Sequence, residues 1–403
     1  MRGQALGLYI SIPFCRSKCT YCNFASGVYP ASEHARYVQR LIEDMAKAGA
    51  WAAEMRVELP RAVDTVYLGG GTPSLLEPEL IAQLFDAMRG EFNFTSDAEI
   101  TVECAPGQIA QPTLEALAAA GVNRVSLGVQ SFIDREAAES GRLHKRVTVL
   151  DDLRRLRAAG ITNLNLDLIA GLAGQTFASW EESLDVLIEA GVPHASVYML
   201  EVDEDSRLGR EMLAGGARYH AELVPPDDAI ARMYERGIER LETSGLTQYE
   251  ISNFSRPGFM SRHNLRYWER RPYLGLGLDA SSALYAGGDE GYVLRATTGG
   301  DLKGYLEGGG DPETAWLSPD RQFEEAWFLG LRVNAGVDCA ALRAEFGDGR
   351  MAAALEVAER LVGDGLVSWD GERVSLTARG RMISNDVFQE FLGVTDAVTV
   401  ERS

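Results

Sequence analysis

Positive charge is scarce in this sequence of 403 residues, in which 39 Lys and Arg stand against 59 Asp and Glu, a formal net charge of −20. No segment is rich enough in Lys and Arg to reverse this excess locally. An acidic surface repels both a phosphate backbone and anionic lipid headgroups. The composition therefore argues against non-specific binding of nucleic acid and against docking on an anionic membrane.

Long apolar runs are also missing. Nowhere does the sequence contain the roughly 18 to 20 consecutive apolar residues that a membrane-spanning helix needs. It begins MRGQALGLYISIPFC, an apolar stretch that Ser11 and Pro13 interrupt and that no small-residue cleavage pattern follows. We therefore expect a first β-strand here, with no signal peptide and no integral membrane segment.

Cysteine is sparse and unevenly distributed. The five cysteines are too few for a disulfide framework, which indicates a reducing compartment and a cytoplasmic location. We expect the two distal ones, Cys104 and Cys339, to be buried free thiols. The other three, Cys15, Cys19 and Cys22, lie within one short segment.

Six short segments rich in Val, Ile, Leu and Tyr predict β-strands, and segments with a 3.6-residue apolar period predict helices between them. The strands are expected at 7–12, 63–68, 99–103, 124–129, 163–169 and 195–200, and the helices at 32–58, 77–90, 111–120, 148–159 and 178–190. This βα alternation predicts an α/β fold, a parallel sheet with helices outside. Periodicity alone does not choose between an open sheet and a complete or partial barrel.

The alternation stops after residue 201, and we expect three units along the chain: 1–205, 206–315 and 316–403. The middle unit contains a helical segment near 226–244 and an aperiodic region at 248–310. In the last unit, helices are expected at 320–332, 350–364 and 378–392, with a hairpin at 366–377 that turns at Asp370-Gly371. This C-terminal α+β unit is winged-helix-like, but it is acidic and lacks a basic recognition helix, so it is expected to pack or to dock a partner.

The strongest chemical signal is Cys15-Arg-Ser-Lys-Cys19-Thr-Tyr-Cys22, directly after the first strand. Three cysteines this close in the sequence either ligate one metal centre or occur together by chance. Zinc normally takes four ligands, often as two C-x2-C pairs, and no second pair exists here, although a histidine could complete the set. A 4Fe-4S cluster held by three thiolates, with one iron open to a further ligand, fits the spacing better.

Polar residues and glycines fall at the ends of the other predicted strands. They are Gly69, Gly70, Gly71, Thr72 and Pro73 after the second strand, Glu103 after the third, Gln130 after the fourth, Asp167 on the fifth and Glu201 after the sixth. Each alone is explained by a tight turn or by capping of a strand end. Because ligands bind at the carboxyl ends of parallel strands, their joint placement predicts a binding cavity.

The sequence resembles the HemN/HemW group of radical S-adenosylmethionine (SAM) proteins over nearly its whole length. The resemblance is carried by YISIPFCRSKCTYCNF, YLGGGTPSLL, GVNRVSLGVQSF with GRLH, LNLDLIAGLAGQT, and QYEISNFSRPGFMSRHNLRYW. It implies a partial (β/α)6 TIM-like barrel over 1–205, a barrel extension over 206–315 that carries HNLRYW, and a C-terminal domain over 316–403.

The resemblance also implies roles for individual residues. Cys15, Cys19 and Cys22 would ligate the 4Fe-4S cluster, and SAM would complete it. The first SAM site would involve Tyr9, Tyr21, Gly70, Gly71, Thr72 and Glu103, and the rest of the cavity would be lined by Gln130, Arg142, Asp167 and Glu201, some of which hold a second SAM in the oxidases. The implied chemistry is one-electron cleavage of SAM to methionine and a 5′-deoxyadenosyl radical, which requires an electron donor.

Two branches share these motifs: oxygen-independent coproporphyrinogen III oxidases and haem chaperones. The oxidases have a fourth cysteine two residues beyond the third, where this sequence has Phe24, and a longer leader than the 14 residues that precede Cys15. His263 begins the H-N-x-x-Y-W motif of the chaperone branch, where the histidine is associated with haem. Imidazole is a common haem ligand, and Tyr267 and Trp268 offer an apolar wall for a porphyrin.

The sequence also departs from the group at several positions. Ala173 replaces a proline, Cys104-Ala105 precedes Pro106 in place of the usual pair, and Ser281 stands where a histidine is usual. Ser281 therefore weakens the case for a second haem-binding histidine, although its position remains a candidate part of the cofactor site. We expect a haem chaperone that delivers haem to a client protein. The alternative is a coproporphyrinogen III oxidase, and a zinc-binding interaction protein is a third reading. The sequence leaves open whether SAM is cleaved and whether the chain forms a homodimer.

Overall fold

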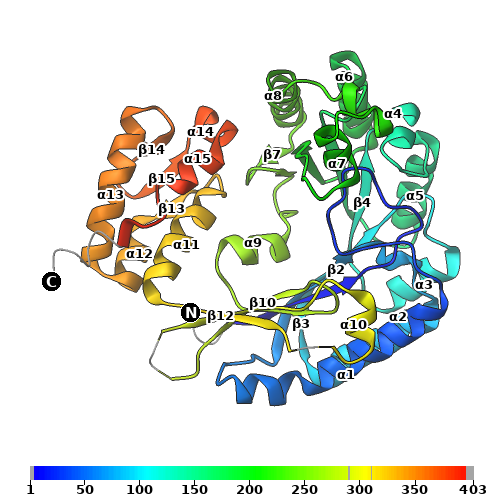
Figure 1. The fold of residues 1–403 in the computed structure, drawn as a ribbon, viewed down its shortest axis with the longest axis horizontal. Helices are drawn as coiled ribbons and strands as arrows, with labels where there is room; N and C mark the ends of the chain where they lie inside the picture. The colour runs from blue at the N-terminus through cyan, green and yellow to red at the C-terminus, as the bar shows by residue number, and fades with distance from the viewer. Residues whose placement is uncertain (1–3, 289–290, 310, 396–403) are drawn as a thin grey trace.

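The computed structural model describes residues 4–288, 291–309 and 311–395. Within these residues, one large sheet contains twelve strands in the order β12-β11-β10-β9-β1-β2-β3-β4-β5-β6-β8-β7 (Figure 1). Its centre is six parallel strands in chain order: β1 (Leu6–Ile12), β2 (Ala62–Gly70), β3 (Asn93–Cys104), β4 (Arg124–Gln130), β5 (Asn163–Ala170) and β6 (His194–Met199). The six strands predicted from the sequence are confirmed.

Helices connect these strands as the apolar period predicts. They are α1 (Ser32–Glu54), α2 (Pro78–Glu91), α3 (Gln111–Ala119), α4 (Asp134–Glu139), α5 (Arg146–Ala158) and α6 (Phe177–Ala190), with a 3-10 turn η1 (Pro73–Leu75) before α2. Three details differ from the expectation. Helix α1 ends at Glu54, four residues before the predicted 58. Helix α4 is too short to show a period. Strand β3 begins six residues before the predicted 99, because its polar first residues pair with the start of β2 while remaining largely exposed.

The sheet does not close on itself, so the barrel is partial. Beside β1 it continues through β9 (Tyr273–Leu276), which is parallel to β1, and antiparallel β10 (Ser281–Tyr285), β11 (Val293–Thr297) and β12 (Glu313–Leu317). Beside β6 it continues through antiparallel β8 (Asn253–Ser255) and then β7 (Thr247–Gln248). The aperiodic region 248–310 thus contains strands of three to five residues, too short to give a sequence period.

The first strand shows how the barrel is packed. Leu6, Leu8, Ile10 and Ile12 are completely buried in the main core, which also contains residues of α1. The alternate residues face the lumen, where an ideal Cβ on Gly7 would lie 2.4 Å from Cδ of Arg266. The lumen below the carboxyl ends of the strands is therefore filled with side chains.

The remaining elements of the first 310 residues are α7 (Arg207–Leu213), the 3-10 turn η2 (Arg218–Leu223), α8 (Asp227–Thr243), α9 (Arg262–Trp268) and α10 (Leu302–Leu306). Helix α8 packs beside α6, where Nε1 of Trp180 donates to the backbone carbonyl of Met233 at 2.6 Å. Among the described residues, no helix is both long and apolar enough to span a membrane.

The C-terminal part has its own core and a three-stranded sheet in the order β13-β15-β14. Its elements are α11 (Pro319–Leu331), β13 (Val337–Asp338), α12 (Cys339–Phe346), α13 (Asp348–Gly363), β14 (Val367–Trp369), β15 (Arg373–Leu376), α14 (Ala378–Met382) and α15 (Ser384–Gln389). The predicted hairpin is confirmed, with Gly371 at φ +99° in its turn. Figure 1 shows this part, coloured orange to red, beside β7 and α9.

Candidate functional site

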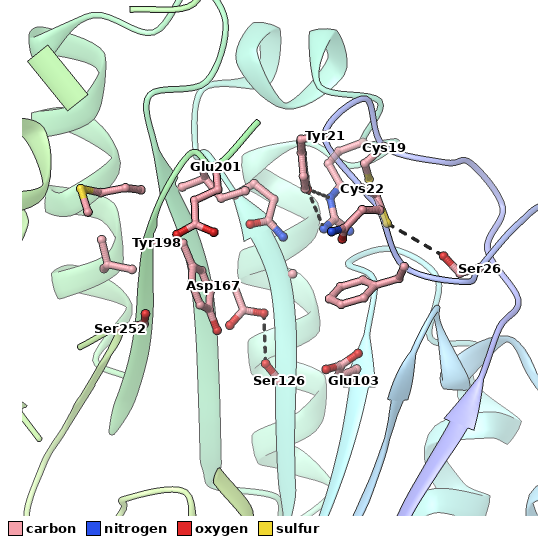
Figure 2. Close-up of a pocket in the computed structure, with 18 of the residues that line it drawn as sticks. Cys19, Tyr21, Cys22, Ser26, Glu103, Ser126, Asp167, Tyr198, Glu201 and Ser252 are labelled. Atoms are coloured by element: carbon pink, nitrogen blue, oxygen red, sulfur yellow. Dashed lines mark hydrogen bonds between the residues drawn. The ribbon is translucent and has the colours of Figure 1, made fainter. Parts of the chain in front are cut away.

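A cavity of about 820 Å³ lies at the carboxyl ends of the parallel strands. That volume is typical of a site for a cofactor-sized ligand. The sequence-predicted residues that line it are Cys15, Cys19, Tyr21, Cys22, Gly70, Gly71, Thr72, Glu103, Gln130, Arg142, Asp167 and Glu201. In Figure 2 the cysteine loop forms one side, Tyr198 and Ser252 lie on the other, and Glu103 and Asp167 lie between them.

The three cysteines lie on the loop that follows β1, and all are free and partly exposed. Backbone hydrogen bonds fix this loop: the Cys15 amide donates to the Gly27 carbonyl at 2.8 Å, and the Thr20 amide donates to the Ser140 carbonyl at 3.1 Å. In the described part of the chain, no three His, Cys, Asp or Glu side chains are grouped around a position for a single metal ion. The donor set facing the cavity is three soft thiols, which fits an iron–sulfur cluster by ligand chemistry.

The glycine segment at the end of β2 lies directly against the cysteine loop. The Gly71 amide donates to the Ile12 carbonyl at 2.9 Å, and the Thr72 amide to the Phe14 carbonyl at 2.8 Å. A Cβ on Gly71 would lie 2.7 Å from the Ile12 carbonyl oxygen, and Gly70 has φ +94°. Glycine is therefore needed here because two backbone segments of this chain meet.

Glu103, at the end of β3, is held from below by Tyr67, whose hydroxyl donates to Oε1 of Glu103 at 2.7 Å. Burial, reinforced by the nearby Asp167 carboxylate, raises the pKa of Glu103 to about 7. The Tyr67 hydroxyl, the Gly70 amide and Arg142 act in the opposite direction. This carboxyl group therefore changes its charge near neutral pH.

Gln130 and Arg142 form the part of the wall beside β4. Gln130 has φ +69°, and the pairing of β4 with β5 is irregular between Gly128 and Gln130. A positive φ in a non-glycine residue costs about 1 kcal/mol or more and is typical of functional sites. Arg142 donates from Nη2 and Nε to the Tyr21 hydroxyl, at 3.0 and 3.2 Å, and so ties the α4–α5 loop to the cysteine loop.

Asp167 and Glu201 come from β5 and from the segment after β6. Asp167 accepts hydrogen bonds from Ser126 Oγ at 3.1 Å and from Asn165 Nδ2 at 2.7 Å, and burial raises its pKa. Glu201 is exposed at the mouth of the cavity. Figure 2 shows both side chains on the same wall as Tyr198.

Three sequence-predicted residues, Tyr9, Ser281 and His263, do not line the cavity. The Tyr9 hydroxyl lies 3.4 Å from an ideal Cβ on Gly70, so Tyr9 supports the glycine segment from beneath. Ser281 lies exposed on β10, where its hydroxyl pairs with that of Thr297 at 3.0 Å. The geometry gives no support to a cofactor contact for Ser281.

His263 is buried in α9, beneath the cavity. Its Nδ1 lies 2.9 Å from Thr65 Oγ1, its Nε2 lies 2.9 Å from the Tyr267 hydroxyl, and its ring centroid is 5.2 Å from that of Tyr67. Burial, aided by two nearby arginines, lowers the pKa of His263 to about 3. Because both ring nitrogens are hydrogen-bonded and the ring is 1% exposed, this conformation does not present His263 as a haem ligand, contrary to the expectation from its motif.

Arg266 of the same HNLRYW segment also packs inside the barrel. Arg266 is completely buried, pairs with Asp64, and donates to the carbonyls of Ala5 at 2.8 Å and Pro272 at 2.9 Å. These contacts plug the lumen below Glu103 and Tyr67. The segment therefore supports the floor of the cavity.

Sequence reasoning missed two parts of the wall. One is His144 of the GRLH block, a buried side chain whose Nε2 has no partner among the described residues and whose pKa burial lowers to about 4. The other comes from the C-terminal part, which contributes Arg332 and residues 381–386. His144 lies inside a motif block but was not singled out, whereas the C-terminal residues are far from the motifs in the chain and no local pattern marks them.

Comparison with known proteins places these features in context. The radical SAM superfamily model matches residues 9–187, and the HemN C-terminal domain model matches residues 317–383. The heme chaperone HemW of Bacillus subtilis is 34% identical over 391 residues, which cover 96% of this chain and 98% of that protein. The heme chaperone HemW of Mycobacterium tuberculosis is 35% identical over 403 residues, which cover 98% and 96%.

The fold has a close counterpart among solved structures. The radical SAM enzyme coproporphyrinogen III oxidase (HemN) from Escherichia coli superposes with a TM-score of 0.81, covering 96% of this chain and 90% of the other. The two sequences are 24% identical, so this likeness establishes the fold alone: a radical SAM barrel with a C-terminal domain.

Proposed function

Since this chain belongs to the HemW family of radical SAM proteins, we propose that it is a haem chaperone, which binds haem beside a 4Fe-4S cluster and SAM and delivers the haem to a client protein. The observation that carries the proposal is the identity of 34–35% to heme chaperones over nearly the full length of both chains. Phe24, in the position of the oxidases' fourth cysteine, is consistent with it.

The cofactors of a radical SAM protein fit the residues of the cavity. Cys15, Cys19 and Cys22 would hold the cluster through their thiolates, from a loop braced by the glycine segment of β2. When bound, the cluster supplies one electron to the sulfonium of SAM. A cluster-reducing electron donor is therefore one of the partners we propose.

The chain's own residues would bind and orient SAM. Glu103, in its ionised form, would accept hydrogen bonds from the SAM amino group, while Tyr67 fixes the direction of its carboxylate. Gln130, Arg142 and Asp167 would define the opposite wall. Arg142 is held by the Tyr21 hydroxyl and Asp167 by the Asn165 side chain, and the filled lumen beneath them keeps water away from the lower side of the site.

A haem-transfer experiment tests the function. Anaerobically reconstituted protein is loaded with haem, separated from free haem, and mixed with a haem-free client whose absorbance reports haem uptake. We expect the client to take up haem faster from this protein than from haem bound to albumin. In parallel, the reduced protein receives SAM and coproporphyrinogen III. Formation of protoporphyrinogen IX with enzymatic turnover would identify an oxidase and refute the chaperone proposal.

A further inference from the structure

Two arginines at the end of the cavity away from the cysteine loop have no acidic partner. Arg332 follows α11, and Arg381 lies in α14 of the C-terminal part; both line the cavity. Among the described residues, neither guanidinium has a carboxylate within ion-pair distance, and Nε of each is buried without a hydrogen-bond partner. In a chain with a net charge of −20, two unpaired guanidinium groups in one cavity are unusual.

The positions of both arginines are fixed by the protein. The Ile251 amide donates to the Arg332 carbonyl at 3.1 Å, and the Arg332 guanidinium stacks 4.3 Å from the centre of the Trp268 ring. Nη1 of Arg381 donates to the Leu376 carbonyl at 3.1 Å. The remaining N–H groups of these side chains are therefore held in place before any ligand arrives, which lowers the entropic cost of binding an anion.

Carboxylates near this end do not neutralise the arginines. Burial raises the pKa of Glu250, with the Asn253 side chain and Arg332 acting in the opposite direction. The Glu250 carboxyl group accepts hydrogen bonds from the Ser252 amide at 3.0 Å and from the Asn253 side chain. Asp386 also lines the cavity, exposed to solvent. Neither forms an ion pair with Arg332 or Arg381 in the described part of the chain.

The rim of the same cavity is apolar and exposed. Phe24 and Leu143 are each 62% exposed, and Ile383 is 39% exposed, although all three line the cavity. Large exposed apolar side chains around a pocket mark a surface that an apolar ligand or partner covers. The cavity thus combines an apolar rim with a positively charged end, which suits an apolar body carrying carboxylates and does not suit the cationic sulfonium of SAM.

We propose that Arg332 and Arg381 bind the two propionate carboxylates of haem, with the porphyrin ring lying against the apolar rim formed by Phe24, Leu143 and Ile383. This inference rests on the proposed function, because it assumes that the ligand is haem. It assigns the C-terminal part a direct role in holding the ligand. SAM and haem would then share one cavity, with the haem propionates at the end away from the cysteine loop.

Haem dimethyl ester, in which both propionates are neutral, is the diagnostic probe. Full-length reconstituted protein is titrated with haem and with the ester, and binding is followed by the Soret absorbance. We expect the wild-type protein to bind haem about tenfold or more tightly than the ester, the size expected for hydrogen bonds between charged groups. Arg381→Met and Arg332→Met should each weaken haem binding about tenfold and reduce the preference over the ester.

Matched variants separate this effect from damage to the fold. Arg379→Met removes an exposed arginine from the same helix, outside the cavity, and should leave haem binding unchanged. Arg381→Lys keeps the charge and should retain part of the affinity. Cluster absorbance should be the same in all variants.

Equal affinity of the wild type for haem and the ester would overturn the inference and leave the chaperone function intact. An equal loss in Arg379→Met and Arg381→Met would also overturn it. A wild-type protein that binds neither porphyrin would refute the proposed function itself. Loss of SAM affinity without loss of haem affinity in Arg381→Met would assign the arginines to a different anion.

Discussion

The charge of Glu103 should make SAM binding depend on pH. This carboxyl group lies inside the barrel mouth at the end of β3, and its removal from water raises its pKa to about 7, well above that of an exposed glutamate. A protonated carboxyl group accepts hydrogen bonds from the SAM amino group much more weakly than a carboxylate does. Affinity for SAM should therefore reach its plateau only well above the pKa of about 7, should be about half of the plateau value at that pKa, and should fall further as the pH drops below it.

The magnitude follows from the ionised fraction. At one pH unit below a pKa of about 7, the ionised fraction is roughly one tenth, so SAM affinity should be roughly tenfold lower at pH 6 than at its plateau, or about 1.4 kcal/mol. Tyr67→Phe removes a hydrogen bond that stabilises the carboxylate. The pKa of Glu103 should then rise, and the midpoint of the affinity curve should move to higher pH.

Anaerobic equilibrium dialysis with labelled SAM between pH 5.5 and pH 8.5, values chosen to bracket the pKa of about 7, measures this dependence on reconstituted protein. Glu103→Gln is the control, since its amide does not titrate: its affinity should be low and nearly independent of pH. If Glu103→Gln shows the same pH slope as the wild type, another group controls SAM binding and the assignment of Glu103 is wrong. A midpoint unmoved by Tyr67→Phe would contradict the role given to Tyr67.

Three further outcomes are expected. Cys19→Ser should abolish the cluster's visible absorbance and reduce the bound iron while leaving the far-ultraviolet dichroism unchanged; retention of full iron content would refute the cluster assignment. Gly71→Ala should destabilise the protein by about 1–3 kcal/mol in urea melts, because its Cβ would collide with the Ile12 carbonyl, whereas Gly90→Ala, on an open helix surface, should stabilise slightly. His263→Ala should cost about 1–3 kcal/mol, because it leaves the Tyr267 hydroxyl without its histidine partner and opens a cavity beside Tyr67, with the Soret maximum of bound haem unchanged. Loss of an axial-ligand signature at unchanged stability would restore the histidine as a haem ligand.

The central barrel could be predicted because its signals are local. Each parallel strand is a short apolar run, and each outer helix shows its period within its own sequence. The flanking strands β9 to β12 could not be found this way. They are four or five residues long, and their pairing with β1 or with one another depends on tertiary contacts.

The candidate site divides along the same line. Residues at the carboxyl ends of parallel strands converge by topology, so Glu103, Gln130 and Asp167 could be placed together from their positions alone. Arg332 and Arg381 could not, because they reach the cavity only through packing of the C-terminal part against residues 249–251. Whether a guanidinium has an acidic partner depends on tertiary contacts, so it could not be predicted from the sequence.

The HNLRYW motif marks residues that matter to the structure, but the role expected for its histidine differs from the one that the structure shows. Its histidine was expected at a haem iron, yet every ring nitrogen is satisfied inside the barrel, and the arginine three positions on is buried against Asp64. The His263 ring packs near Tyr67, and Tyr67 holds Glu103 at the floor of the cavity. A chain of contacts therefore leads from this motif to the SAM end of the site. Substitutions in the motif should therefore weaken SAM binding by displacing Tyr67 and Glu103, without any contact between the motif and haem.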